Sequence, residues 1–308
     1  MKLIRQLEDL PREFRGGAVS IGNFDGVHRG HARIVERLKR MAEEVGGPAV
    51  VFTFDPHPVR VLRPQHAPPP LTWTDRKATL LAQLGVNAML VYPTDEQLLS
   101  LTPTAFFQHV VIDSLDARAV VEGPNFFFGQ ARAGTVEVLA QLCSNSARQL
   151  EVVQPLMHGD DYISSSRVRE LVRQGDVSTA RNLLTEPYRI RGMVTHGAAR
   201  GAKIGFPTAN IDAVDTLLPA QGVYAGRAIV AGSVWPAAIN VGPNPTFGEH
   251  ALKVEAHLIE FGDSLYGKPL EVDFLARLRD IRSFDSVERL KEQLAADVQK
   301  TRTLCATK

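Results

Sequence analysis

Short apolar runs alternate with amphipathic stretches through the first half of the chain. The apolar runs have the length and composition of buried strands, and they lie at residues 18–21, 48–54, 88–92, 119–121 and 150–153. The stretches between them repeat their apolar residues with helical spacing, at residues 31–44, 75–84, 104–115 and 136–142. This alternation predicts an α/β domain with a doubly wound parallel sheet, in which ligands bind beyond the carboxyl ends of the strands.

The pattern of the second half is different. Two short helices are expected up to about residue 184, and the sequence from 188 to 278 then consists of short alternating segments separated by glycine and proline. That pattern predicts a small antiparallel β-barrel. A final helix is expected from about 286 to 302, with its apolar residues on one face. We therefore expect two domains, residues 1–184 and 185–308.

Composition narrows the function classes. The 308 residues are 44% hydrophobic and 22% charged, as in ordinary globular proteins. Lys and Arg total 35 against 34 for Asp and Glu, which argues against a nucleic-acid-binding protein. No apolar run approaches the ~20 residues of a membrane span, the first residues do not read as a secretory signal, and Cys143 and Cys305 have no metal-ligand spacing. We expect a cytoplasmic enzyme that binds neither nucleic acid nor membrane; the sequence leaves its oligomeric state open.

A motif with direct chemical meaning follows the first of these predicted strands and opens the first helix. It reads GNFDGVHRGH and occupies residues 22–31. Its glycines let the backbone approach a ligand closely, and a helix N-terminus favours phosphate. His28 and His31 are three residues apart, so both can project from one helical turn toward the same anion and stabilise charge on it. The alternative, a turn with surface histidines, is weaker for such a pair at a strand–helix junction.

The His-x-Gly-His element of this motif resembles the nucleotidyltransferase superfamily. The longer string, together with Phe54-Asp55-Pro56-His57-Pro58, resembles the prokaryotic bifunctional riboflavin kinase/FMN adenylyltransferase family. The resemblance covers roughly residues 15–300, with motifs in the expected order in both halves. It implies that His28 and His31 are catalytic residues. It also implies contacts to ATP from Gly22, Asn23, Phe24, Asp25, Gly26 and Gly30.

A second string, Ser164-Ser165-Ser166-Arg167-Val168-Arg169, stands where the family has the other motif of the superfamily, with Ser166 in place of threonine. A hydroxyl is kept, so the resemblance implies catalytic roles at the ATP phosphates for Ser165, Ser166 and Arg169. The segment also reads as a helix cap. Both interpretations can hold, because a capped helix start is itself an anion site.

The flavin side of this half depends on the string Glu122-Gly123-Pro124-Asn125-Phe126-Phe127-Phe128-Gly129. Asn125 stands where the family usually has an acidic residue, and its amide can still hydrogen-bond the edge of a flavin ring. The resemblance implies flavin binding by Asp55, Asn125 and Phe128, with phenylalanine supplying a stacking face. A role of the phenylalanines in the core alone is the alternative.

The second half carries a glycine-rich string of its own, from Gly197 to Ile211. Thr208 and Asn210 place two neutral oxygens at alternate positions, which suits a hydrated Mg²⁺ bound to ATP phosphates. By itself this signal is weak, but the Gly-Phe-Pro-Thr-Ala-Asn part resembles the riboflavin kinase motif that holds Mg-ATP. Ala202 stands where the family usually has arginine, a role for which Lys203 or Arg200 could compensate. Contacts to ATP are expected from Gly197, Gly201, Lys203 and Gly205.

The resemblance also implies that Glu255, in the string Val254-Glu255-Ala256-His257, is the general base toward the ribityl hydroxyl of riboflavin. The alternative is an exposed carboxylate on a strand. The implied reactions are riboflavin plus ATP giving FMN, then FMN plus ATP giving FAD and pyrophosphate, each with Mg²⁺. Three other functions remain open: a monofunctional enzyme with one degenerate half, a nucleotidyltransferase for another phosphate substrate, and a non-catalytic flavin-binding regulator.

Overall fold

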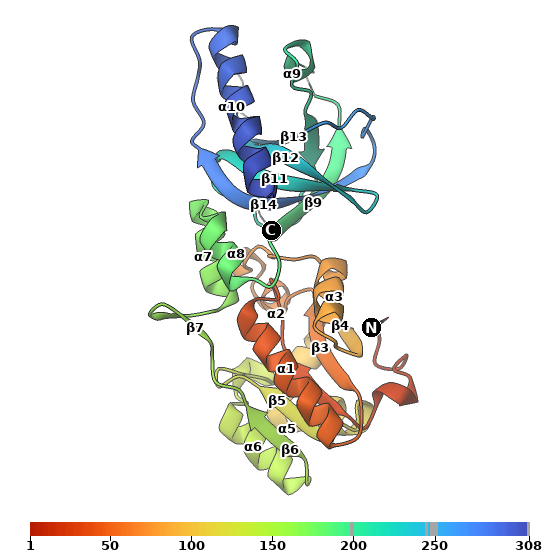
Figure 1. Ribbon diagram of the computed structural model, residues 1–308. Helices are drawn as coiled ribbons and strands as arrows, with labels where there is room; N and C mark the ends of the chain where they lie inside the picture. Colours follow the sequence, from red (N-terminus) through yellow and green to blue (C-terminus); the bar gives the residue numbers. More distant parts are fainter. Residues whose placement is uncertain (198–199, 244–245, 247–251, 307–308) are drawn as a thin grey trace. The chain divides into compact units, whose positions relative to one another are not determined.

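The computed structural model describes residues 1–197, 200–243, 246 and 252–306 (Figure 1). The chain forms two compact units. The first unit comprises residues 1–69 and 74–164, and the second comprises residues 70–73 and 165–308. Within the described residues, no helix is long and apolar enough to cross a membrane.

The first unit is built on a six-stranded sheet with the order β1-β4-β3-β2-β5-β6, in which every neighbouring pair is parallel. Its strands are β1 (Lys2–Ile4), β2 (Ala18–Ile21), β3 (Ala49–Asp55), β4 (Ala88–Pro93), β5 (Ala119–Glu122) and β6 (Gln149–Val152). Successive strands add on one side of β2 and then, from β5, on the other. The order therefore reverses between β2 and β5, and a crevice is expected there beyond the carboxyl ends of the strands.

Helices cover both faces of this sheet. They are α1 (Arg29–Glu44), α2 (Pro58–Leu62), α3 (Thr74–Gln83), α4 (Glu96–Leu99), α5 (Pro103–Phe106), the π-helix η3 (Phe107–Ser114) and α6 (Val136–Asn145). The remaining elements are the 3₁₀ turns η1 (Arg12–Phe14), η2 (Pro64–His66) and η4 (Gln130–Arg132) and the hairpin of β7 (Met157–His158) and β8 (Asp161–Tyr162). Alternate strand residues enter two separate apolar cores: Val19 packs with η3 and α6, whereas Ala18 packs with α1 and α3. The predicted doubly wound sheet is confirmed.

The second unit is a closed barrel with the strand order β10-β13-β12-β11-β14-β9, antiparallel throughout. Its strands are β9 (Tyr188–Thr195), β10 (Ala209–Asp212), β11 (Gly222–Val230), β12 (Ser233–Gly242), β13 (Lys253–Leu258) and β14 (Pro269–Arg279). Its helices are α7 (Ser165–Gln174), α8 (Val177–Leu183), α9 (Arg200–Lys203) and α10 (Val287–Ala306). Residues along β9 and β13 alternate between buried and more exposed, as a barrel with a side-chain core requires. The predicted barrel with a C-terminal helix is confirmed.

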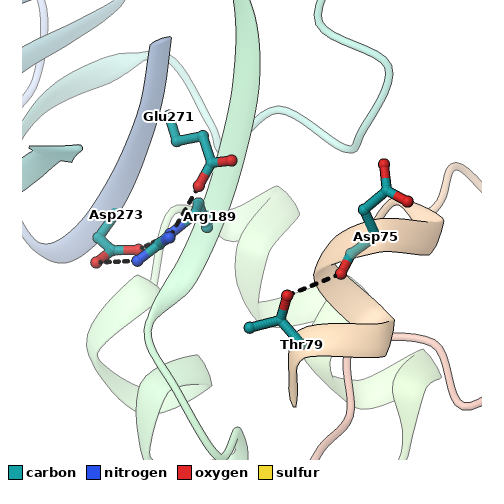
Figure 2. A network of polar contacts seen from close by, with 5 residues as sticks. All are labelled: Asp75, Thr79, Arg189, Glu271 and Asp273. Carbon is teal, nitrogen blue, oxygen red and sulfur yellow. Dashed lines mark hydrogen bonds and ion pairs between the residues drawn. The ribbon is translucent and has the colours of Figure 1, made fainter. Parts of the chain in front are cut away.

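Two arginines of β9 make contacts that stabilise the second unit, one with the neighbouring strand β14 and one with the segment 70–73. On adjacent strands, Arg189 pairs with Asp273 at 2.6 Å and with Glu271 at 2.9 Å (Figure 2). Arg191 lies over the ring of Trp73, with its guanidinium carbon 4.8 Å from the ring centroid. Trp235 is on β12, so both tryptophans of the chain belong to the second unit.

Candidate functional site

The loop between β2 and α1 holds an unusual backbone conformation. Phe24, Gly26 and Val27 have positive φ values of 46°, 83° and 40°. Val27 is β-branched and fully buried, so its conformation is strained and the surrounding structure must maintain it. The Thr53 hydroxyl helps to do so by donating to the Asn23 carbonyl at 3.2 Å. Backbone strain of this kind is concentrated at ligand-binding sites.

The two histidines of the motif lie against one another at the start of α1. His28 caps the helix: its Nδ1 accepts the His31 backbone N–H at 3.3 Å. An accepting Nδ1 carries no proton, so in this cap Nε2 is the ring nitrogen of His28 that can donate to a ligand. The rings stack with centroids 3.6 Å apart. Glycine is needed at position 30, because a Cβ there would lie 3.0 Å from the His28 ring and 3.3 Å from the Ile163 carbonyl.

Burial first, and then the charges of His28 and Lys77, lower the pKa of His31 well below its ordinary value. His31 is therefore a neutral imidazole at neutral pH, and its Nδ1 is buried with no hydrogen-bond partner among the described residues. Lys77 is itself buried, which lowers its pKa, while Asp25 and Asp55 raise it. Its ammonium donates to the Thr53 hydroxyl at 3.3 Å. The buried Lys77 ammonium is thus close enough to His31 to lower its pKa.

A cavity of about 270 Å³ opens in the crevice between β2 and β5. Seven of the predicted site residues line it: Gly22, Asn23, Phe24, His28, Gly30, His31 and Asn125. Glu122, at the end of β5, also lines it. Glu122 begins the string expected on the flavin side but was not among the predicted site residues, because it also reads as the last residue of an otherwise apolar strand.

Four other predicted residues of this unit do not line the cavity: Asp25, Gly26, Asp55 and Phe128. Asp25 is buried near Lys77, and Asp55 accepts the Thr74 hydroxyl at 2.6 Å. Phe128 is buried in the core, 5.3 Å from the Phe126 ring, and Phe126 lines the cavity instead. Of the aromatic string, the structure therefore brings Asn125 and Phe126 to the cavity.

Ser165, Ser166 and Arg169 lie in the first turns of α7, where Arg169 is buried. This helix belongs to the second compact unit. Their catalytic roles stay a prediction.

The second unit has its own cavity, of about 140 Å³, which is lined by strands of the barrel and by α10. Four predicted residues line it: Gly201, Thr208, Asn210 and Glu255. Strand register explains how three polar side chains meet there, because Glu255 is directly opposite Asn210 on one neighbouring strand and Asn240 on the other. Cross-strand neighbours point to the same face, so a carboxylate stands between two amides.

The other predicted residues of the glycine-rich string do not line this cavity: Gly197, Lys203 and Gly205. A Cβ at Gly197 would come within 2.2 Å of the Asn210 side chain, and Gly205 has a φ of 93°. Residues 198–199 of this string, and residues 244–245 and 247 of a later string that resembles the family, lie outside the described residues.

The opposite wall of this cavity is largely apolar, with Ile281, Phe284, Leu290, Leu294 and Val298. It also holds an ion pair: Asp297 is fully buried and accepts from Arg279 at 2.9 Å. His257 lines the cavity too, and its Nδ1 lies 2.7 Å from the Pro207 carbonyl. Sequence reasoning missed Asn240, His257, Arg279 and Asp297. One signal for Asp297 was available in the sequence: it is a charged residue among the apolar positions on one face of the last helix.

The side-chain oxygens in this cavity can be compared with the ligands that a divalent metal ion requires. Among the described residues there is no cluster of three His, Cys, Asp or Glu side chains that could hold a metal ion by itself. Thr208 and Asn210 instead supply neutral oxygens on the same cavity wall as Glu255. Such a sparse donor set fits a metal that takes most of its ligands from ATP phosphates and water.

A doubly wound unit with His-x-Gly-His at a strand–helix junction, joined to a barrel whose cavity combines an apolar wall with a carboxylate between two amides, defines a two-part ATP-dependent transferase. Family models agree: FAD synthetase matches residues 10–167 and riboflavin kinase matches residues 184–305. The chain belongs to the family of bifunctional riboflavin kinase/FMN adenylyltransferases.

Relatives with that name match over nearly the whole chain. The one from Pseudomonas fluorescens is 36% identical and covers 99% of this chain and 98% of its own length. The one from Bacillus subtilis is 36% identical, with 91% and 90% covered, and the one from Escherichia coli is 32% identical, with 96% of each covered. A crystal structure described as a macrolide-efflux protein from Streptococcus pneumoniae has the same fold, with a TM-score of 0.86 and 32% identity over 97% of this chain and 98% of that one.

Proposed function

We propose that this chain phosphorylates riboflavin to FMN in its C-terminal domain and adenylylates FMN to FAD in its N-terminal domain, using Mg-ATP in both reactions. The observation that carries the proposal is that each unit has a cavity of its own, lined by groups suited to one of the two reactions. The functional domains are residues 1–184 and 185–308, and the enzyme works in the cytoplasm without nucleic acid or membrane.

In the kinase reaction, Glu255 accepts the proton of the terminal ribityl hydroxyl while that oxygen attacks the γ-phosphorus of ATP and ADP leaves. The amides of Asn210 and Asn240 on either side of Glu255 keep the carboxylate and the hydroxyl oriented. The apolar wall opposite suits the isoalloxazine ring, which lacks charge. Thr208 and Asn210 would hold Mg²⁺, which when bound neutralises phosphate charge. Gly197, Gly201, Lys203 and Gly205 contact ATP.

In the adenylyl transfer, a phosphate oxygen of FMN attacks the α-phosphorus of ATP and pyrophosphate leaves, with no covalent enzyme intermediate. His28 donates through Nε2 to the phosphate oxygens that gain charge in the transition state. Neutral His31 supplies a second donor beside it. Ser165, Ser166 and Arg169 hold the leaving phosphates.

The remaining site residues of the first unit bind the two substrates. The loop from Gly22 to Gly30 encloses ATP, because its glycines let the backbone come close to a phosphate and the helix start that follows favours an anion. Flavin is bound by Asp55, Asn125 and Phe128, of which Asn125 lines the cavity. An amide can donate to a flavin carbonyl and accept from a flavin N–H, so Asn125 needs no charge for this task.

A time course with riboflavin and Mg-ATP, in which FMN, FAD and pyrophosphate are resolved by chromatography, tests the proposal. We expect FMN to rise first and then to be consumed as FAD and pyrophosphate appear together. FMN that accumulates without FAD would show a monofunctional kinase, FAD made only from supplied FMN would show a monofunctional adenylyltransferase, and flavin binding without ATP turnover would show a regulator.

A further inference from the structure

Glu122 bridges the two strands that separate at the crevice of the first unit. β2 and β5 are paired at Ala18 with Ala119 and at Val19 with Val120, and the pairing ends there. The Glu122 side chain spans the widening gap, where its Oε1 accepts the backbone N–H of Ile21 at 2.5 Å. The carboxyl group thus replaces a missing ladder bond at the end of β2, directly before the loop that leads to His28.

The surroundings of this carboxyl group contain no described cation that is paired with it. Glu122 is 4% exposed, and burial raises its pKa well above the ordinary value, an effect that the Ile21 N–H and the Ser20 hydroxyl offset only in part. Apart from Glu122, the titratable side chains that line the cavity are His28 and His31, both from the start of α1. The lining residues from β2, from the end of β6 and from residues 123–126 carry no charge.

We propose that Glu122 is a positioning residue for FMN adenylylation and that it acts in its protonated form. As a neutral acid it fixes the end of β2 without placing a negative charge in a cavity that must admit the phosphates of ATP and FMN. Once ionised, the buried carboxylate would repel those phosphates, because its own surroundings screen the charge less than bulk water does. This inference rests on the proposed adenylyl transfer in the first unit.

The test is the pH profile of FAD formation from supplied FMN and Mg-ATP, measured for the unmodified chain and for Glu122→Gln. Glutamine can still accept the Ile21 N–H but cannot ionise. We expect kcat/KM of the unmodified chain to fall on the alkaline side by about tenfold or more, because like charges brought together cost several kcal/mol. Glu122→Gln should keep the rate at neutral pH and lose this alkaline fall.

Glu151→Gln is the matched control, because Glu151 lies on the neighbouring strand β6, does not line the cavity and is paired with Arg37. It should keep the alkaline fall. The proposal would be overturned if kcat/KM of Glu122→Gln still decreased at alkaline pH as it does in the unmodified chain. It would also be overturned if Glu122→Gln formed FAD slowly at neutral pH. If the unmodified chain makes no FAD at all, the proposed adenylyl transfer fails instead.

A measurement without turnover keeps the inference testable in that case. The infrared difference spectrum between the unmodified chain and Glu122→Gln at neutral pH should contain the C=O band of a protonated carboxylic acid. A difference spectrum that contains only carboxylate bands would overturn the proposal. Glu122→Ala, which also removes the acceptor of the Ile21 N–H, should slow FAD formation at every pH.

Discussion

Replacing Asp297 by alanine should destabilise the second unit strongly. The Asp297 side chain is 2% exposed, and its Oδ2 accepts from Arg279 Nε at 3.0 Å and Nη2 at 2.9 Å. Its other oxygen, Oδ1, accepts from the Gln293 amide at 2.9 Å. Arg279 is also mostly buried, so removal of the carboxylate leaves a guanidinium without its counter-charge. Breaking such a buried pair costs about 3 kcal/mol or more.

Urea unfolding followed by tryptophan fluorescence measures this loss in the second unit alone, because Trp73 and Trp235 both belong to it. With a slope of about 2 kcal/mol per molar urea, the midpoint should fall by about 1.5 M. Asp280→Ala is the control, since Asp280 is 85% exposed in its pair with Arg277 and should cost less than about 1 kcal/mol. An Asp297→Ala midpoint as close to the unmodified chain as that of the control would refute the reasoning. Because Asp297 lines the kinase cavity, KM for riboflavin should rise as well.

Three further predictions concern the first unit. Gly30→Ala should slow FAD formation and leave FMN formation unchanged, because the added Cβ would lie 3.0 Å from the His28 ring; equal slowing of both steps would contradict this. Lys77→Met should destabilise this unit by about 1–3 kcal/mol in urea unfolding followed by circular dichroism, because the buried Asp25 loses a nearby positive charge and the Thr53 hydroxyl loses its hydrogen-bond donor. Burial lowers the pKa of His31 in the folded unit. As the pH falls below the ordinary value of 6.5, the imidazole therefore takes up a proton in the unfolded chain but stays neutral in the folded unit. The stability of the first unit should therefore fall as the pH drops below 6.5, and His31→Gln should reduce that fall; an unchanged pH dependence would be evidence against a buried neutral His31.

The two folds could be predicted because their signals are local and repeated. Buried parallel strands need mainly apolar runs, and β2, β3, β4 and β5 carry one, whereas the edge strand β6 has only two apolar residues, Leu150 and Val152. β1 was missed because Lys2–Ile4 is too short for a periodic signal and is a strand only through its pairing with β4. The predicted helix at 104–115 is split into α5 and a π-helix, a detail of backbone hydrogen bonding that side-chain periodicity does not encode.

The sites could be predicted only where the residues are close together in the sequence. His28 and His31 share one helical turn, so their stacking follows from their spacing. Glu255 and Asn240 meet through strand register, and Glu122 reaches the cavity because β2 and β5 separate beside it. Neither relation is visible before the strands are paired. The resemblance implied Phe128 at the flavin, but the structure packs Phe128 in the core and Phe126 lines the cavity, because which of the two phenylalanines faces inward depends on the path of the loop.

The central claim, that residues 1–184 carry the complete adenylyl transfer and residues 185–308 the complete kinase reaction, is tested most directly by mixing two variants. His28→Ala should convert riboflavin to FMN at the unmodified rate and slow FAD formation by about 10² or more. Glu255→Gln should slow FMN formation by about 10² or more and still convert supplied FMN to FAD. An equimolar mixture of the two variants should make FAD from riboflavin, because FMN released by one chain is a substrate for the other. A variant that keeps its blocked step, or a mixture that makes no FAD, would contradict the account.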